Sequence, residues 1–441
     1  MFGWRDRSVE CSGIVLFRGL PPRLENFSQF AREKMRVTPI TAGPDELWAA
    51  TLEHGSWGKA TIRCARNFQP VPRMVLEFDA RLDDEDRQAA RSAKSAVLVT
   101  LKTTRKNILG DRKLLLRFMR SIMDNDGLIA MDMPAHKFWP RDAMEDELAH
   151  DADLDIESLF VTHLIHEPAP EGSDAEPRAY WAHTHGLAEL GALDFDILRP
   201  SPLLTGAGYD TFRSVAFLIL EGEVGPGTNR HPVILPRGEC SFVSIEEFNR
   251  NAPAEDIALR DGTADPDHNR NRLVLCDPRR TGLLGWLGLG RVRPSRLLST
   301  IDDEHMMCIF TTSATELMAD RARRTFELFQ KFTEEFREFE VQPLVKLGHV
   351  VDGGDPTERE HMWFEVNGFA KDKVDATLLN QPFNIARMKA GDRAQHGLEV
   401  LTDWQILTPV GSITPREMIA ARRMRANREK LREVLAQHRK G

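Results

Sequence analysis

The fold class follows from residues 96–133, which read AVLVTLKTTRKNILGDRKLLLRFMRSIMDNDGLIAMDM. The first seven residues are rich in apolar and β-branched side chains and predict a strand. Residues 109–123 predict a helix, because their apolar side chains recur at three- and four-residue steps. Asp126 and Gly127 then predict a turn into a second strand over residues 128–133.

Outward from this stretch, strands and helices follow one another without a strict βαβ period. Residues 179–185 and 195–198 predict strands, and residues 209–221 predict a helix. This pattern favours an α+β fold over a doubly wound parallel sheet. A length of 441 residues predicts more than one domain. We therefore expect a multidomain α+β protein with mixed sheets and packed helices.

A phenylalanine-rich helix is predicted over residues 313–340, where Phe326, Phe329, Phe332 and Phe336 share one side. Because this stripe would otherwise expose a large apolar patch, we expect it to pack against another domain or another copy of the chain. Short alternating strands joined by glycine and asparagine turns follow it. They predict a small antiparallel sheet or barrel, followed by a terminal helix.

Changes in composition divide the chain into five expected segments. These are an N-terminal α+β segment, a central α+β domain, a loop-rich connector with a glycine-rich apolar hairpin and the phenylalanine helix, a small β domain, and a basic helix. Their expected ranges are 1–94, 95–225, 226–340, 341–412 and 413–441.

Charge is unevenly distributed along the chain. The formal net charge is −8, but residues 415–441 contain nine Lys and Arg against three Glu, a net of +6 that leaves −14 on the remainder. An acidic body argues against nucleic acid as the main partner, since phosphate binding needs a basic surface. We expect a protein partner or self-association, and we expect the basic helix to lie on the acidic body of its own chain.

The cysteines and the N-terminus predict a cytoplasmic protein. Five cysteines is an odd number, and their spacing fits neither a metal site nor a disulfide framework. Charges interrupt the N-terminus before a secretory signal can form. The apolar runs are far shorter than the ~20 residues of a membrane-spanning helix, so no transmembrane segment is expected.

Two histidines on one predicted strand are the main candidates for chemistry. His183 and His185 are two residues apart and therefore point to the same face. His163 lies on the predicted neighbouring strand, and Asp194 follows Gly191, which allows the chain to turn back. Two imidazoles and a carboxylate can form a zinc or iron site with an open position for water. We favour the other interpretation, in which no metal or other cofactor is bound and the imidazoles form structural hydrogen bonds to backbone or carboxylate groups.

Four short blocks in the C-terminal part carry a family resemblance. They are His361-Met-Trp-Phe-Glu-Val366, Leu378-Leu-Asn-Gln-Pro382, Gly391-Asp392 and Asp403-Trp404. In this order and spacing they resemble the YegJ-like family, domain of unknown function twenty-three-fourteen, over about residues 341–409. The resemblance implies a bacterial protein and leaves the biochemical role open.

A second block, residues 182–198, begins AHTHGL and resembles domain of unknown function forty-twenty-six, with the HTHGL motif at residues 183–187. In that family the block precedes a YegJ-like domain, which is the order found here. This resemblance also implies no biochemical role.

The C-terminal blocks suggest either structure or a ligand groove. In the structural interpretation Trp363 and Trp404 are buried, and the Asn and Gly-Asp residues form turns. In the functional interpretation a set of side chains from these blocks lines a groove. That set is His361, Trp363, Glu365, Asn380 and Trp404.

No motif of nucleotide binding or nucleophilic catalysis is present. The glycines of residues 285–290 lack the Gly-Lys-Ser/Thr of a phosphate-binding loop, and there is no Gly-x-Ser-x-Gly serine. The sequence therefore favours a non-enzymatic binding or regulatory factor, including an immunity- or stress-associated one. The alternatives are a metal-dependent hydrolase centred on the His-x-His pair and a structural subunit of an oligomer.

Overall fold

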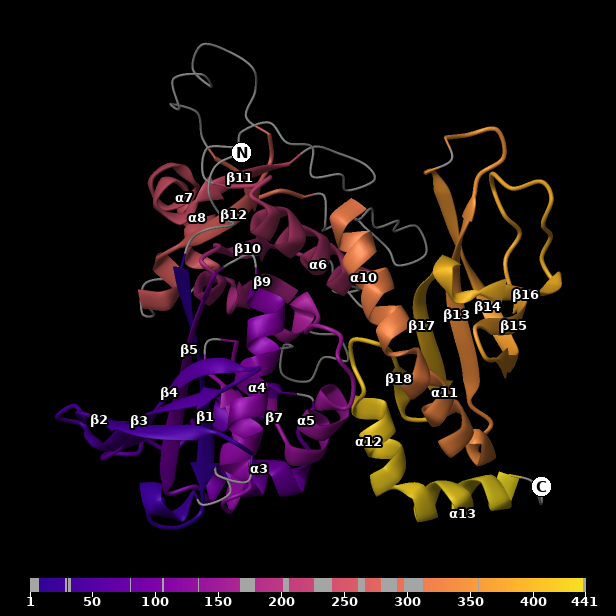
Figure 1. Ribbon diagram of the computed structural model, residues 1–441. Helices are drawn as coiled ribbons and strands as arrows, with labels where there is room; N and C mark the ends of the chain where they lie inside the picture. Colours follow the sequence, from indigo (N-terminus) through magenta and orange to yellow (C-terminus); the bar gives the residue numbers. More distant parts are fainter. Residues whose placement is uncertain are drawn as a thin grey trace. The chain divides into compact units, whose positions relative to one another are not determined.

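The computed structural model describes residues 8–27, 30, 33–79, 81–104, 107–133, 135–166, 179–200, 206–225, 240–260, 266–278, 292–296, 312–355 and 357–438. The chain forms two compact units (Figure 1). The N-terminal unit comprises Met1–Trp139 and Ile156–Thr311, and the C-terminal unit comprises Pro140–Asp155 and Thr312–Gly441. These units cut across the five expected segments, because one short segment of the chain leaves the first unit and joins the second.

The N-terminal unit contains an antiparallel seven-stranded sheet with the order β2-β3-β4-β5-β1-β6-β7. The predicted strand, helix and second strand of residues 96–133 are confirmed as β5, α4 and β6. The elements are β1 (Ser8–Phe17), β2 (Arg36–Ile40), β3 (Glu46–His54), β4 (Gly58–Ala65), α2 (Arg73–Phe78), α3 (Asp84–Arg91), β5 (Ser95–Thr104), α4 (Ile108–Met123), β6 (Gly127–Asp132) and β7 (Lys137–Trp139).

Helices cover both faces of this sheet. Helix α4 packs where Gly13 of β1 leaves room for the Met119 side chain, since a Cβ at Gly13 would overlap the Met119 sulfur. On the other face, Leu76 and Leu82 near α2 and α3 are buried against Leu16 and Ile129. The apolar, β-branched character of residues 72–78 predicts a strand, and this prediction is wrong. The segment forms α2 because a helix buries Leu76 while its solvent side carries the Arg73–Glu77 ion pair.

A second, five-stranded sheet completes the N-terminal unit, with the order β11-β12-β10-β9-β8. Strands β10 and β12 are parallel, and the other pairs are antiparallel. Its elements are η3 (Ile156–Ser158), β8 (Val161–His166), β9 (Ala179–His185), η4 (Leu187–Leu190), β10 (Asp194–Leu198), α6 (Gly206–Glu221), β11 (Ser241–Ser244), α7 (Ile245–Asn251), α8 (Ala254–Ala258), η5 (Pro266–Asn269) and β12 (Arg272–Cys276).

The two faces of the second sheet bury different side chains. Phe195 stacks on Phe212 of α6, with ring centroids 5.5 Å apart. On the opposite face, Trp181 and Leu198 pack with Phe248 of α7. The apolar runs of residues 233–235 and 306–310 also predict strands. These two ranges and the glycine-rich stretch 281–290 lie outside the described residues.

The C-terminal unit is built on an antiparallel six-stranded sheet with the order β16-β15-β14-β13-β17-β18. The predicted small antiparallel sheet followed by a helix is thus confirmed, and so is the α+β class of the whole chain. The elements are α5 (Arg141–Leu148), α10 (Thr312–Arg324), α11 (Phe326–Glu335), η8 (Arg337–Phe339), β13 (Gln342–Val350), β14 (Arg359–Ala370), β15 (Lys373–Leu378), β16 (Arg393–Gly397), η9 (Leu398–Val400), β17 (Leu401–Thr408), β18 (Gly411–Ile413), α12 (Ile419–Ala426) and α13 (Arg428–His438).

The phenylalanine stripe forms the core of this unit. All four predicted phenylalanines are buried, and they pack with Phe364 and Trp404 of the sheet. The single predicted helix is divided into α10 and α11 at Thr325. The Thr325 hydroxyl donates a hydrogen bond to the Arg321 carbonyl and accepts one from the Trp404 indole N–H at 3.0 Å. The helix break therefore supplies the polar partner that a buried tryptophan needs.

The basic C-terminal helices are paired with carboxylates of their own unit. Arg425 of α12 contacts Asp146 of α5 at 3.1 Å and Glu335 of α11 at 2.9 Å. Arg428 and Arg432 of α13 share Glu338. This is the arrangement expected from the separation of a basic tail from an acidic body.

The cysteines of the described residues carry no disulfide. Cys11, Cys64, Cys240 and Cys276 are buried and lie outside any disulfide, and Cys308 lies outside the described residues. Among the described helices, none has both the length and the apolar character that crossing a membrane requires.

Candidate metal site

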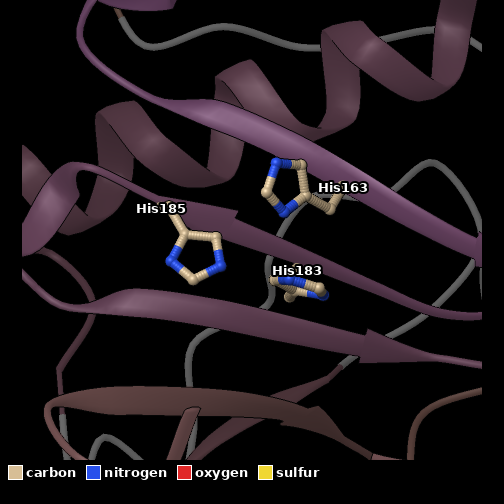
Figure 2. A group of neighbouring side chains, drawn as sticks. All are labelled: His163, His183 and His185. Atoms are coloured by element: carbon tan, nitrogen blue, oxygen red, sulfur yellow. The ribbon is translucent and has the colours of Figure 1, made fainter. Parts of the chain in front are cut away.

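Two neighbouring strands bring three histidines together in the N-terminal unit. In the β8–β9 pair His163 lies directly opposite His183, so their side chains share one face of the sheet. His185 is two residues further along β9 and therefore lies on that face as well. Figure 2 shows the three rings side by side, with one from β8 and two from β9.

The spacing of the rings suits a shared metal ion. The ring centroids are 5.1 Å apart for His163–His183, 5.1 Å for His163–His185 and 4.9 Å for His183–His185. Two imidazoles on one tetrahedral zinc ion, with zinc–nitrogen distances of about 2.0–2.1 Å, have centroids about 5 Å apart. One ring nitrogen of each histidine lies within 4.8 Å of the other two. Small side-chain rotations would bring these nitrogens to the ~3.3 Å separation of such a complex.

The planes of the three rings are also suitable. His163 and His185 each lie nearly perpendicular to His183, at 87° and 80°, and His163 is tilted by 52° from His185. An imidazole lone pair lies in the plane of its ring. Rings that are inclined to one another can therefore direct their nitrogens to a common point, whereas rings stacked face to face cannot.

Burial keeps these imidazoles neutral. The His183 side chain is only 2% exposed, and His163 and His185 are half-buried. Burial holds the pKa of His163 at about 4 and that of His185 at about 2, and it also lowers the pKa of His183. The positive charge of Arg272 and the neighbouring imidazoles lower these pKa values further. Neutral imidazole is the form that binds Zn, Cu, Fe and Ni ions.

His183 has an unusual hydrogen-bonding state. Neither Nδ1 nor Nε2 of this buried ring has a hydrogen-bond partner among the described residues. A buried polar atom without a partner costs about 1–3 kcal/mol. The alternative expected from the sequence, in which each imidazole bonds to backbone or carboxylate groups, therefore does not describe His183.

Asp194, the other candidate ligand, is hydrogen-bonded to backbone amides. Its carboxylate accepts hydrogen bonds from the Thr184 hydroxyl at 2.9 Å and from the amides of Leu187 and Ala188 at 3.2 and 3.4 Å. These hydrogen bonds stabilise the turn after β9, which contains η4. Gly186 precedes η4 and Gly191 follows it, and both glycines have a positive φ. In the part of the chain that the structure describes, the group able to hold a metal consists of the three histidines without Asp194.

A buried carboxylate lies beside the histidine strand, because Asp196 is directly opposite His183 in the β9–β10 pair and shares its face of the sheet. Asp196 of β10 accepts hydrogen bonds from Arg260 at 2.7 Å and from Arg272 at 2.8 Å. Arg272 also donates to the carbonyl of Thr184, the residue between His183 and His185, at 2.7 Å. All three charged side chains are at most 2% exposed. This network fixes the backbone from which the two ligand candidates project.

Two further histidines, missed by the sequence analysis, flank the three. His268 of η5 places its Nε2 atom 3.2 Å from Nε2 of His185. His136, between β6 and β7, stacks on His185 and His163 with ring centroids 5.1 and 5.8 Å away. Both come from separate short segments, so no periodicity or spacing in the sequence links them to the His-x-His pair.

The groove expected in the C-terminal unit does not form as one site. Trp404 is fully buried on the face that packs against α11, whereas Trp363 lies half-buried on the opposite face beneath Lys346. His361 bonds to Thr402 and Glu365 to Gln342, both at 3.1 Å, and Asn380 is exposed. Trp363 is therefore less buried than Trp404, because β14 alternates its side chains between a core face and a polar face.

Comparison with known families concerns the C-terminal unit. Residues 313–428 match the family model DUF2314, described as "Uncharacterized protein conserved in bacteria". The comparisons with curated proteins and with solved structures found no match. The match begins well before the expected boundary at residue 341, because the phenylalanine helices are part of the same core. The resemblance of residues 182–198 to a second family stays a prediction. Residues 313–428, in the C-terminal unit, are therefore similar to this uncharacterized bacterial family, DUF2314.

Proposed function

We propose that the protein binds a transition-metal ion, with zinc as the best-suited one, through His163, His183 and His185. The observation that carries the proposal is His183, a fully buried neutral imidazole whose two nitrogens have no partner among the described residues. Two other imidazoles lie at the centroid spacing that a tetrahedral complex requires. Binding an ion would satisfy one His183 nitrogen and remove the cost of its burial.

The same geometry favours a metal-binding or metal-responsive factor over a hydrolase. A hydrolytic site needs a water on the metal and a group that accepts its proton. Asp194 and Asp196, the carboxylates of β10, are bonded to Thr184 and to two arginines respectively. The hydrolase stays the second candidate, because a three-histidine set leaves one coordination position open.

We infer that this binding takes place in the cytoplasm and that the metal state is communicated to a protein partner. The free, buried thiols and the acidic net charge support this inference. Cell fractionation tests the location, and a secreted or membrane-bound product would contradict it. Size-exclusion chromatography with light scattering, with and without zinc, tests self-association, which a purely monomeric species in both conditions would exclude.

The direct test is metal loading of the purified chain. We expect one zinc ion per chain by elemental analysis after dialysis, and an affinity measurable by competition with a chromophoric chelator. A His183→Asn/His185→Asn variant should lose more affinity than the about 10–100-fold that disturbing outer partners of metal ligands costs.

The matched control is His54→Asn, a histidine of β3 in the same unit that bonds to the amides of Ser56 and Trp57. It should keep the wild-type stoichiometry and affinity. A wild-type chain that takes up no stoichiometric metal, or a double variant that binds as tightly as wild type, would refute the proposal.

A further inference from the structure

We propose that His268 is the fourth ligand, so that the ion of the proposed site sits in a closed sphere of four imidazoles. This inference rests on the proposed function, and it identifies the kind of site: one that retains an ion rather than one that activates a water molecule. It involves a residue 83 positions from His185 in the chain.

The position of the His268 nitrogen carries the inference. Its Nε2 atom lies 3.2 Å from Nε2 of His185. These two nitrogens form a hydrogen bond, and their separation is also close to the ~3.3 Å between two nitrogens bound to the same tetrahedral zinc ion. The His268 ring centroid lies 4.8 Å from that of His183 and 5.1 Å from that of His185, again close to the ~5 Å of a shared ion.

The orientation of the ring distinguishes His268 from His136. The His268 ring is inclined by 70° to His183 and by 48° to His185, so its in-plane lone pair can converge with theirs. The His136 ring is stacked on its neighbours, at 30° to His185 and 22° to His163. Rings stacked in this way direct their lone pairs along separate, nearly parallel planes. His136 therefore covers the site without the geometry of a ligand.

The surrounding network holds His268 as firmly as it holds the histidine strand. Arg260 donates a hydrogen bond to the His268 carbonyl at 2.5 Å and is itself bound to Asp196. The same carboxylate binds Arg272, which fixes the carbonyl of Thr184 between His183 and His185. One buried aspartate thus positions η5 and β9 together, which is the outer support that metal ligands commonly have.

A closed sphere of four neutral imidazoles has a chemical consequence. Structural zinc sites use four protein ligands, whereas catalytic ones keep a position for water or substrate. With His268 bound, no position is left for water. The site would hold its ion for stability or sensing, and releasing His268 would be the step that exposes the metal.

The test counts ligands in the full-length protein loaded with zinc alone. X-ray absorption at the zinc edge should show four imidazole nitrogens in the wild type, and three with one oxygen in His268→Ala. The matched control His136→Ala should keep four. By chelator competition, His268→Ala should bind zinc at least about tenfold more weakly, and His136→Ala should stay within about twofold of wild type.

His268→Asn, which keeps a polar side chain of smaller size, serves as a second variant, and circular dichroism of the metal-free chains checks that each variant folds. The wild-type ligand count needs no variant and decides the question by itself. Zinc bound by three imidazoles and a water in the wild type, or unchanged affinity in both His268 variants, overturns the fourth ligand while the metal site stands. Failure of the wild type to bind zinc at all overturns the proposed function and this inference with it.

Discussion

Gly186 shows how one residue sets the geometry of the histidine strand. It follows His185 directly, has a φ of +116°, and lies in the tight turn at the end of β9. A Cβ at this position would overlap the Leu159 carbonyl oxygen and would lie 3.0 Å from the Phe160 Cα and 3.1 Å from the Ala135 Cα. These neighbours are backbone atoms and cannot move aside as a flexible side chain can.

We therefore expect Gly186→Ala to lower the free energy of unfolding of the N-terminal unit by at least about 2 kcal/mol, from strain and overlap together. The control is Gly58→Ala, which has a φ of +79° and no atom within 4 Å of the added carbon. Gly58→Ala should lower the free energy of unfolding only by the about 1–2 kcal/mol that a left-handed backbone costs a residue with a Cβ. Urea unfolding of both variants checks this, and equal losses would contradict the role given to packing at Gly186.

The candidate metal site shows which of its residues can be predicted from the sequence. Alternation along a strand places His183 and His185 on one face, and a predicted neighbouring strand makes His163 the third candidate; the structure brings those three together. Asp194 is a further candidate ligand in the sequence, because Gly191 allows the chain to turn back. In the structure its carboxylate accepts hydrogen bonds from backbone amides instead. His268 and His136 approach from distant segments, and no local pattern encodes that approach.

At the scale of elements, the sheet of the C-terminal unit carries a buried pair of histidines. His349 of β13 and His396 of β16 both contact Phe364, and their ring centroids are 5.2 Å apart. The Nε2 atoms of both are buried and have no hydrogen-bond partner among the described residues. Burial, with His396, Arg387 and Arg359 nearby, lowers the pKa of His349 to about 4. Burial also lowers the pKa of His396, against the opposing charge of Asp375.

This pair predicts acid sensitivity of the C-terminal sheet. Between pH 6.5 and about 4 the unfolded chain binds protons at these histidines and the folded chain does not, so stability falls as the pH falls. By pH 5 we expect a loss of about 1–2 kcal/mol from His349, reduced because the ring is partly solvated. Hydrogen exchange of β13 and β14, corrected for intrinsic rates, measures it. A His349→Gln/His396→Gln variant should flatten the pH dependence between pH 7 and 5, and an unchanged slope would contradict this assignment.

Helices and strands whose own residues show a clear hydrophobic pattern could be predicted from the sequence. Elements that form only because they pair with or pack on another element could not. The apolar periodicity of α4 and the composition of β9 predicted those elements nearly with their observed bounds. Strand β2 is mostly exposed and exists because it pairs with β3, so its own residues show little alternation. The segment 72–78 has strand-like composition but becomes α2, since the fully buried Leu76 side chain fits a helix on the sheet.

The division of the chain into two units is the feature that the sequence predicted least well. Predicted domains were continuous stretches of chain, whereas the C-terminal unit recruits Pro140–Asp155 from within the N-terminal unit. The recruited segment matters because of one buried ion pair. Arg321 of α10, with a side chain 4% exposed, is bound by both carboxylate oxygens of Glu147 in α5, at 2.8 and 3.1 Å. A contact between residues 174 positions apart leaves no trace in local composition.

Because of this ion pair, we expect the region that matches the family model to be less stable without residues 140–155. A polypeptide of residues 312–441 lacks Glu147 and leaves Arg321 as a buried charge with only backbone acceptors such as the Pro415 carbonyl. Removing one partner of a buried ion pair costs about 3–5 kcal/mol. We expect this polypeptide to unfold at a clearly lower urea concentration than one in which residues 140–155 are joined to its N-terminus by a flexible Gly/Ser linker.

The comparison can be followed by tryptophan fluorescence, because Trp363 and Trp404 are the only tryptophans in both polypeptides. The control is the linked polypeptide carrying Glu147→Gln, which keeps the helix α5 but removes the charge. If the ion pair is responsible, the Gln variant should unfold close to the polypeptide that lacks the segment. A variant as stable as the linked parent would instead assign the stabilisation to the packing of α5, and equal midpoints for all three would show that residues 312–441 form a complete folding unit.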